Sequence, residues 1–109
     1  MFRIDPNPTF ARDVVIQVPT DEGYEAHTLR TRFKVVDFDT LTSFDLMKPA
    51  DQTAYLDAIV ERFENVGDHE GKVLEPTPDL KARILAMPFT RAPLMKAYER
   101  ALTEEAQKN

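Results

Sequence analysis

The chain has 109 residues and no cysteine. A chain of this length fits one domain, 1–109, and can bury about 60–70% of its unfolded surface in a single modest core. The lack of cysteine excludes a disulfide framework, thiol redox chemistry and cysteine-ligated metals. The formal net charge of −5 favours solubility and argues against a general nucleic-acid-binding protein, because such proteins are usually basic.

No apolar run reaches the length that is needed to cross a bilayer. Arg3 and Asp5 lie near the N-terminus with no long apolar segment behind them, which argues against a signal peptide. Together with the absence of cysteine, these features fit a cytoplasmic protein.

The segment before the first strand is expected to be an extended arm. Pro6 and Pro8 disfavour helical backbone in the residues that precede them. The apolar side chains of Phe2, Ile4 and Phe10 are expected to hold this arm against the domain.

Two strands are expected next, paired as an antiparallel hairpin. Four of residues 14–18 are β-branched, and Pro19 bounds them, while residues 20–23 have the composition of a turn. Residues 24–37 alternate in character and predict a second, longer strand. Because a hairpin alone is marginally stable, helices must cover its apolar face. That face is expected to carry Val14, Ile16, Val18, Leu29, Thr31, Phe33 and Val35, and the opposite face Arg30, Arg32, Lys34 and Val36.

Two helices are expected in the middle of the chain. Asp39 can cap a short helix from Thr40 to about Lys48, and Pro49 breaks or restarts it. Residues 50–63 give the clearest helical pattern, because large apolar side chains recur at intervals of three and four. The apolar stripes consist of Leu41, Phe44 and Met47 in the first helix and of Leu56, Ile59, Val60 and Phe63 in the second.

The last third of the chain predicts a turn and two further helices. Gly67–Gly71 has turn composition, and residues 72–75 form a short strand or an extended link. Thr77–Pro78 predicts the start of a helix, and Pro88 predicts its end. Pro93 suits the first turn of the final helix. The final helix carries Leu94, Met95, Tyr98 and Leu102 and runs into a polar tail, 103–109, that is expected to fray.

These elements together predict an α+β fold, in which an N-terminal antiparallel β-hairpin packs against three to four C-terminal helices. The chain shows no internal repeat and no low-complexity segment. A single domain with one shared core is therefore expected.

The chain offers few candidates for catalysis. His27 and His69 are far apart, and the adjacent side chains of Asp68, His69 and Glu70 cannot converge on one metal ion with regular geometry. Serine occurs once, as Ser43, inside a predicted helix with no histidine nearby. A glycine-rich phosphate loop is absent. We therefore expect a protein without enzyme activity, catalytic residues, metal site or cofactor.

Arg30, Arg32 and Lys34 form the one concentrated basic row. One interpretation is a solvated sheet face with cross-strand pairing, which the sequence favours. The other is a surface for nucleic acid or an acidic partner, which would make the chain a small nucleic-acid-linked regulatory or adaptor protein. No aromatic residues alternate with the basic ones, so base stacking is not predicted.

A pattern of turns and apolar positions extends over nearly the whole chain. It begins with Pro8-Thr9-Phe10 before the first strand, and its centre reads Phe63-x-x-Val66-x-Asp68-x-x-Gly71. A capped helix at Pro78-Asp79-Leu80 follows, and the pattern ends with Leu94-Met95-x-Ala97-Tyr98-x-x-Ala101-Leu102. This arrangement resembles the tail assembly chaperones of long-tailed bacteriophages and related prophages, with Phe63 where that family usually has Trp.

The resemblance implies a non-enzymatic protein that coats the tape measure protein and keeps it soluble while the phage tail is built in the host cytoplasm. Tail tube protein subunits then displace it, and it is absent from the mature virion. The resemblance also implies that the chain corresponds to the short form of a family in which many members have a frameshifted longer form. Coating a long partner requires many copies, so a homo-oligomer is expected.

Such a protein needs an apolar groove or stripe that accepts an amphipathic helix. The helical half of the chain is expected to supply it, and flexible methionines suit an adaptable binding surface. The predicted binding residues, which suit a core equally well, are Phe63, Leu80, Ile84, Met87, Phe89, Met95 and Tyr98.

Overall fold

The predicted N-terminal hairpin is present, but its first strand is longer than predicted and its second strand ends three residues before the predicted Asp37. In the computed structural model, which describes residues 1–103, strands β1 (Thr9–Thr20) and β2 (Gly23–Lys34) pair antiparallel over 12 residues each. A tight turn joins them, as predicted. Gly23 follows this turn with φ +133°, a conformation that other residues rarely adopt, so glycine is required there.

One face of the hairpin carries the apolar side chains that were predicted for it. Val14, Ile16 and Phe33 are buried against the helices, and Thr31 is buried with them. Val35 is the exception, because β2 ends before it and its side chain is exposed. The alternation of the two strands therefore separates a core face from an open face.

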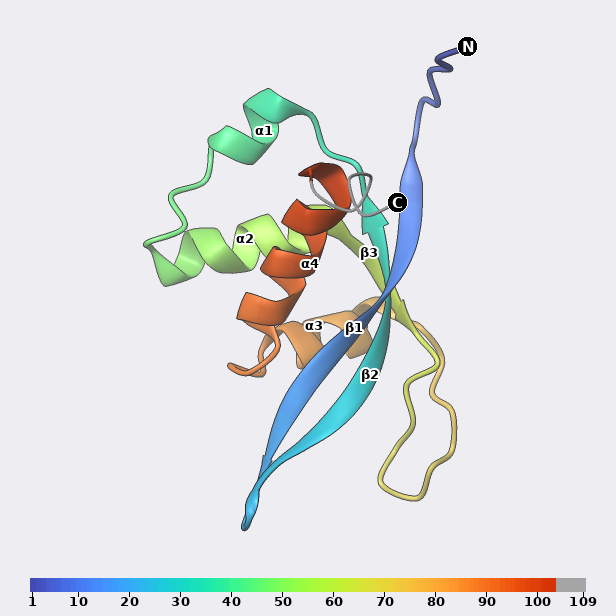
Figure 1. The fold of residues 1–109 in the computed structure, drawn as a ribbon, viewed down its shortest axis with the longest axis vertical. Helices are drawn as coiled ribbons and strands as arrows, with labels where there is room; N and C mark the ends of the chain where they lie inside the picture. Colours follow the sequence, from blue (N-terminus) through green and yellow to red (C-terminus); the bar gives the residue numbers. More distant parts are fainter. Residues whose placement is uncertain (104–109) are drawn as a thin grey trace.

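The predicted helix over residues 50–63 is wrong at its C-terminal end. Helix α2 (Pro49–Ile59) stops at Ile59, and the chain continues as strand β3 (Val60–Glu64) along the edge of β2. The sheet thus has three antiparallel strands in the order β1-β2-β3 (Figure 1). Two successive β-branched residues, Ile59 and Val60, favour extended backbone at the junction.

A bulge explains why this strand has the apolar spacing of a helix. Val60 and Phe63 are three residues apart, so a regular strand would place them on opposite faces. The pairing register with β2 shifts between Arg32 and Phe33, and both Val60 and Phe63 are buried in the core. The irregularity therefore reproduces a spacing that is typical of a helix.

The first helix is shorter than predicted, and its cap is a different residue. Helix α1 spans Phe38–Thr42, and its N-cap is Asp37 rather than Asp39. The Asp37 carboxylate accepts a hydrogen bond from the Thr40 N–H at 2.8 Å. Hydrogen bonding from Thr40 stabilises the charged carboxylate and holds the pKa of Asp37 below its ordinary value.

Side-chain hydrogen bonds replace the helix that was predicted to continue to Lys48. The Asp45 carboxylate accepts from the Met47 N–H at 3.1 Å, and the Asp51 carboxylate accepts from the Asp45 N–H at 2.7 Å. Such bonds compete with helical hydrogen bonding. Met47, which was predicted on an apolar helix side, is consequently exposed.

The two C-terminal helices follow their sequence signals. Thr77 caps α3 (Pro78–Leu85) by accepting a hydrogen bond from the Leu80 N–H at 3.2 Å. A turn around Pro88 leads into α4 (Arg91–Thr103). Of the tail 103–109 that was predicted to fray, Thr103 is the last residue of α4, and residues 104–109 lie outside the described residues.

The helices lie together on one side of the sheet and share one core with it (Figure 1). Rings from β1, β2 and α4 meet there: Phe10, Phe33 and Tyr98 have centroid separations of 5.4, 5.3 and 6.0 Å. The fully buried side chains around them are Leu56, Ile59, Val60, Phe63, Leu94 and Thr31. The core therefore draws on all three strands and on α2, α3 and α4, with α3 supplying Leu80, Ile84 and Leu85.

The Tyr98 hydroxyl fixes α4 to the chain that leaves β2. It donates a hydrogen bond to the Lys34 carbonyl oxygen at 2.8 Å and accepts one from the Val36 N–H at 3.1 Å. Burial raises the pKa of Tyr98, and the bond from Val36 acts in the opposite direction. Tyr55 on α2 packs edge-on against Phe44, and burial raises its pKa too.

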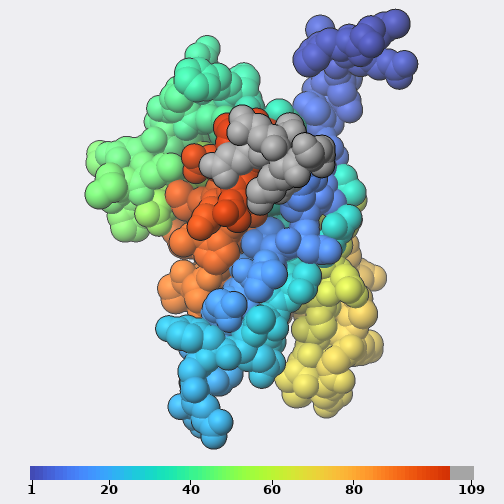
Figure 2. All heavy atoms as spheres, viewed as in Figure 1, coloured from blue at the N-terminus to red at the C-terminus, as the bar shows by residue number. Residues whose placement is uncertain are grey.

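The N-terminal arm, defined here as residues 1–8, projects from the end of β1 into open space (Figures 1 and 2). Its last residue accepts a hydrogen bond from the Val35 N–H at 2.9 Å through the Pro8 carbonyl. The expectation that apolar side chains hold the arm is wrong for Phe2 and Ile4, which are 93% and 89% exposed. The arm extends away from the domain, so only Phe10, on β1, reaches the core.

Candidate protein-binding surface

Four of the seven predicted binding residues lie in the core. Phe63, Leu80, Ile84 and Tyr98 are at most 7% exposed. The sequence left core and interface open for these positions, and their burial means that they act through packing in this structure. Any binding surface is therefore formed by the other three residues and by neighbours that the sequence did not single out.

Met95 lines an open groove between α2 and α4. The groove has a volume of about 970 Å³ and is bounded by the start of α2, the α3–α4 turn and the first turns of α4. At this site Arg91 Nη2 donates to Thr53 Oγ1 at 2.8 Å and joins the two helices. We call this feature the helical groove; its apolar residues are Pro49, Ala50, Ala86, Pro88, Ala92 and Met95, and its polar residues are Gln52, Thr53, Arg91, Lys96 and Glu99.

The helical groove has the chemistry that helix recognition requires. Ala50, Ala86 and Ala92 carry only methyl groups, so another helix can approach closely. Met95 adds a flexible and polarisable contact. The charged side chains of the groove, Lys96 among them, can pair with the polar face of an amphipathic helix.

Met87 and Phe89 lie elsewhere, in a cleft beside the distal half of the hairpin. The cleft has a volume of about 210 Å³, and its lining is mostly apolar. The Thr90 hydroxyl lies 2.9 Å from the carbonyl oxygens of both Ile84 and Met87 and fixes the turn that carries Met87 and Phe89. We call this feature the distal cleft; it is lined by Ile16, Val18, His27, Thr28, Leu29, Asn65, Val66, Gly67, Ile84, Met87, Phe89 and Thr90.

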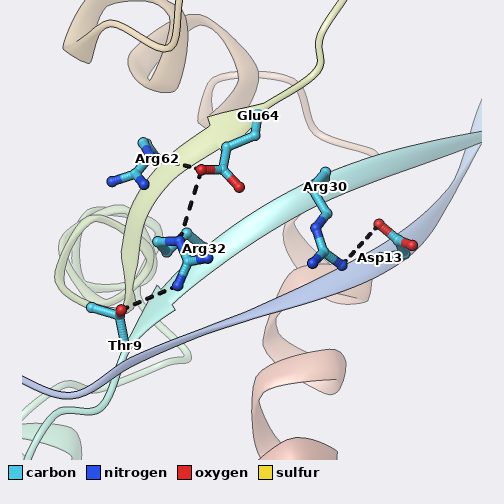
Figure 3. A network of polar contacts seen from close by, with 6 residues as sticks. All are labelled: Thr9, Asp13, Arg30, Arg32, Arg62 and Glu64. Atoms are coloured by element: carbon cyan, nitrogen blue, oxygen red, sulfur yellow. Dashed lines mark hydrogen bonds and ion pairs between the residues drawn. The ribbon is translucent and has the colours of Figure 1, made fainter.

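The basic row lies on the face of the sheet opposite the helices, where acidic residues accompany it (Figure 3). Arg30 forms an ion pair with Asp13 on β1 at 3.3 Å. The Glu64 carboxylate lies 3.8 Å from Arg32 Nε and accepts a hydrogen bond from Arg62 Nε at 2.9 Å. The structure thus forms the cross-strand pairs of a solvated sheet face.

Lys34, the third member of the row, lies beside a hollow at the base of the N-terminal arm. The hollow has a volume of about 730 Å³ and is also lined by Arg32 and Arg62. The acidic residues Asp37 and Glu61 line the same hollow, so its positive charge is partly offset.

The histidines and the single serine are exposed and contact residues that are close to them in the sequence. His27 Nε2 lies 2.8 Å from a Glu25 carboxylate oxygen in an exposed pair, and Ser43 donates to the Thr40 carbonyl at the end of α1. His69 is exposed in the predicted turn. Among residues 1–103, no three His, Cys, Asp or Glu side chains gather as a metal site would require.

Asp68 closes the Gly67–Gly71 turn, which was predicted correctly. Its carboxylate accepts hydrogen bonds from the N–H groups of Glu70 and Lys72 at 2.8 and 2.9 Å. An isolated bridge joins Gly67 to Val73, and the chain beyond it is an extended link. The Asp68 carboxylate therefore holds the turn.

No pattern in the sequence pointed to the alanine and proline residues of the helical groove. Alanine is common on exposed and buried helix faces alike, so only the crossing of two helices reveals which alanines line a groove.

No helix within residues 1–103 combines the length and apolarity of a membrane-spanning segment.

Comparisons with known proteins found no matching family model, no matching curated protein and no matching solved structure.

Proposed function

We propose that this chain is a non-enzymatic assembly chaperone of a phage or prophage tail. It binds the tape measure protein and keeps it soluble in the host cytoplasm until tail tube protein replaces the chaperone. The residue pattern that resembles tail assembly chaperones supplies the partner's identity. The helical groove is the observation that carries the binding mode, because it is broad, mostly apolar and bounded by charged side chains.

The groove explains how one surface can hold many segments of a long helical partner. Methyl groups of alanine make few demands on the side chains opposite them, and Met95 adapts to different shapes. Arg91, Lys96 and Glu99 provide both signs of charge for the polar face of the bound helix. The bound protein is thereby shielded along its apolar stripe, which would otherwise drive aggregation.

The first test is the gene neighbourhood. A tail tube gene upstream and a gene for a very long coiled-coil protein downstream are expected. Metabolic neighbours on both sides would contradict the assignment.

The second test is co-expression with that long protein, measuring its soluble fraction and its co-purification with the chain. Ala92→Glu places a charge in the helical groove at an exposed helix position. We expect binding to fall on the order of tenfold, about 1.4 kcal/mol, because the longer side chain blocks the close approach of a helix and its charge must lose water when a helix covers it.

Ala26→Glu is the matched control, since it adds the same charge at an exposed alanine of the hairpin, away from the groove. It should leave the soluble fraction unchanged. If both variants bind the long protein as well as the unaltered chain does, the groove is not the binding site. If the unaltered chain brings no gain in solubility, the chaperone function itself fails.

A further inference from the structure

The helical groove adjoins a second hollow on the other side of α2. This hollow has a volume of about 390 Å³ and lies between α2 and α3. Four residues line both hollows, so the two meet at these positions and form one trough over the three helices that lie on one side of the sheet (Figure 1). A helix that spans the trough must pass over the shared residues, which are Ala50, Thr53, Ala86 and Arg91.

Arg91 is the charged residue at this junction, and the protein supplies no opposite charge for it. Its side chain is half-buried, and Nη2 donates to the neutral hydroxyl of Thr53 at 2.8 Å. Asp57, the acidic residue of the second hollow, pairs instead with Lys81 at 3.0 Å. No carboxylate within residues 1–103 forms an ion pair with Arg91. Because a guanidinium group has several N–H donors, most of those on Arg91 remain available to a ligand in the trough.

The position of Arg91 is electrostatically unfavourable for the fold itself. It is the first residue of α4, whose first turn contains no acidic residue. The N-terminal end of a helix is positive, so a cation there is repelled where an anion would be stabilised. Arg83, by contrast, lies in the last turn of α3, where a cation is favoured. A residue that departs from such a local rule is typical of a functional site.

A helix that covers the trough removes water from the guanidinium group of Arg91. If the apolar stripe of that helix is continuous, the cation is left without a partner, which is costly. A carboxylate within the stripe replaces the lost hydrogen bonds, since arginine and carboxylate groups match in bidentate geometry. The methyl groups of Ala92 on one side of Arg91 and of Ala54 on the other still contact the apolar residues around that carboxylate.

We propose that Arg91 selects partner helices that carry an aspartate or glutamate within their apolar stripe. The inference rests on the proposed function, because it takes the helical groove as part of the surface that binds the partner. It adds a rule for which segments of a long partner are held. Helices with a carboxylate among their apolar side chains are bound, whereas helices with an uninterrupted stripe leave Arg91 unpaired and are disfavoured.

Two designed peptides of identical composition test this rule. Each is an amphipathic helix of about 18 residues, roughly 27 Å long, with leucine and alanine along its apolar stripe. The first has glutamate at the centre of the stripe and glutamine on the polar face, and the second has these two residues exchanged. We expect the first peptide to bind the unaltered chain about fivefold to tenfold more tightly by fluorescence anisotropy. Because both peptides have the same net charge, the charge of −5 on the protein cannot produce the difference.

Variants of the chain assign the preference to one residue. Arg91→Gln should remove the preference for the first peptide, and Arg91→Glu should reverse it. Arg83→Gln is the matched control, since it removes the same charge from an exposed arginine that lines neither hollow, and it should keep the preference. An Arg91→Gln variant that still prefers the first peptide would overturn the proposal.

Thr53→Val separates the charge of Arg91 from its contact between α2 and α4. The substitution removes the hydroxyl that accepts from Arg91 and leaves the charge in place, so the preference for the first peptide should persist. If Thr53→Val loses the preference as fully as Arg91→Gln does, Arg91 acts by joining the two helices, which contradicts selection by charge.

The outcomes distinguish this inference from the proposed function. If both peptides bind the unaltered chain equally well, Arg91 is not selective, and only this inference fails. If neither peptide binds, the groove is not a helix-binding site, and the proposed binding mode fails together with the inference. Metabolic gene neighbours would remove the assignment to phage tail assembly and leave a measured peptide preference standing.

Discussion

Tyr98 combines three roles in one side chain. Its ring packs between Phe10 and Phe33, and its hydroxyl both donates to Lys34 and accepts from Val36. A tyrosine in the last helix is a common core residue, so its burial is unsurprising. Its hydroxyl partners are not readable from sequence, because they are backbone groups of the last residue of β2 and of the irregular segment after it.

Tyr98→Phe keeps the ring and removes both hydrogen bonds. We expect a loss of about 1–2 kcal/mol in the free energy of unfolding at neutral pH. Urea denaturation followed by circular dichroism measures it, with exposed Tyr24→Phe as the control. A loss no larger than the Tyr24→Phe change would show that the hydroxyl contributes nothing.

The same residue predicts how stability depends on pH. Burial raises the pKa of Tyr98 in the folded state, so folding favours the neutral phenol. The associated stability is fully present below the unfolded pKa of about 10 and is lost as pH rises through the folded pKa. Tyr98→Phe should therefore show a shallower alkaline loss, while Tyr55, whose pKa is also raised, continues to contribute.

At the level of elements, most of the fold follows from local signals. The hairpin, the Thr77 cap and Pro93 in the first turn of α4 were all readable, because alternation, capping and proline act within a few residues. The change from helix to strand after Ile59 was not readable from local signals. It depends on pairing with β2 nearly thirty residues earlier, and the bulge gives the strand a helical spacing.

Phe63→Ala tests whether β3 is a core strand. The side chain is 1% exposed, and we expect a loss of about 3–5 kcal/mol in the free energy of unfolding. Phe38→Ala, at an exposed site, should change stability by less than about 0.5 kcal/mol. A small effect of Phe63→Ala on the free energy of unfolding would mean that β3 is not packed in the core.

At the level of the whole molecule, charge distribution argues against nucleic-acid binding. The net charge is −5, and Arg30 and Arg32 each lie beside a carboxylate on a neighbouring strand. Exposed pairs of this kind contribute little to stability. Their carboxylates do, however, lower the positive electrostatic potential that would attract the phosphates of a nucleic acid.

We therefore expect no binding of duplex DNA or single-stranded RNA by fluorescence anisotropy at about 50 mM salt, where electrostatic binding is strong. Salt-dependent binding that disappears in Arg30→Glu/Lys34→Glu would reverse this conclusion. It would make the regulatory function the leading explanation.

The hydrogen bonds of Tyr98 connect residues that are 62 and 64 positions apart in the chain. During synthesis on the ribosome, the hairpin can form as soon as both strands have emerged, since its partners are close in sequence. The aromatic cluster stays incomplete until α4 has been made. Until then α2 and α3 cover this face of the sheet only in part, and α4 completes the folding of the domain.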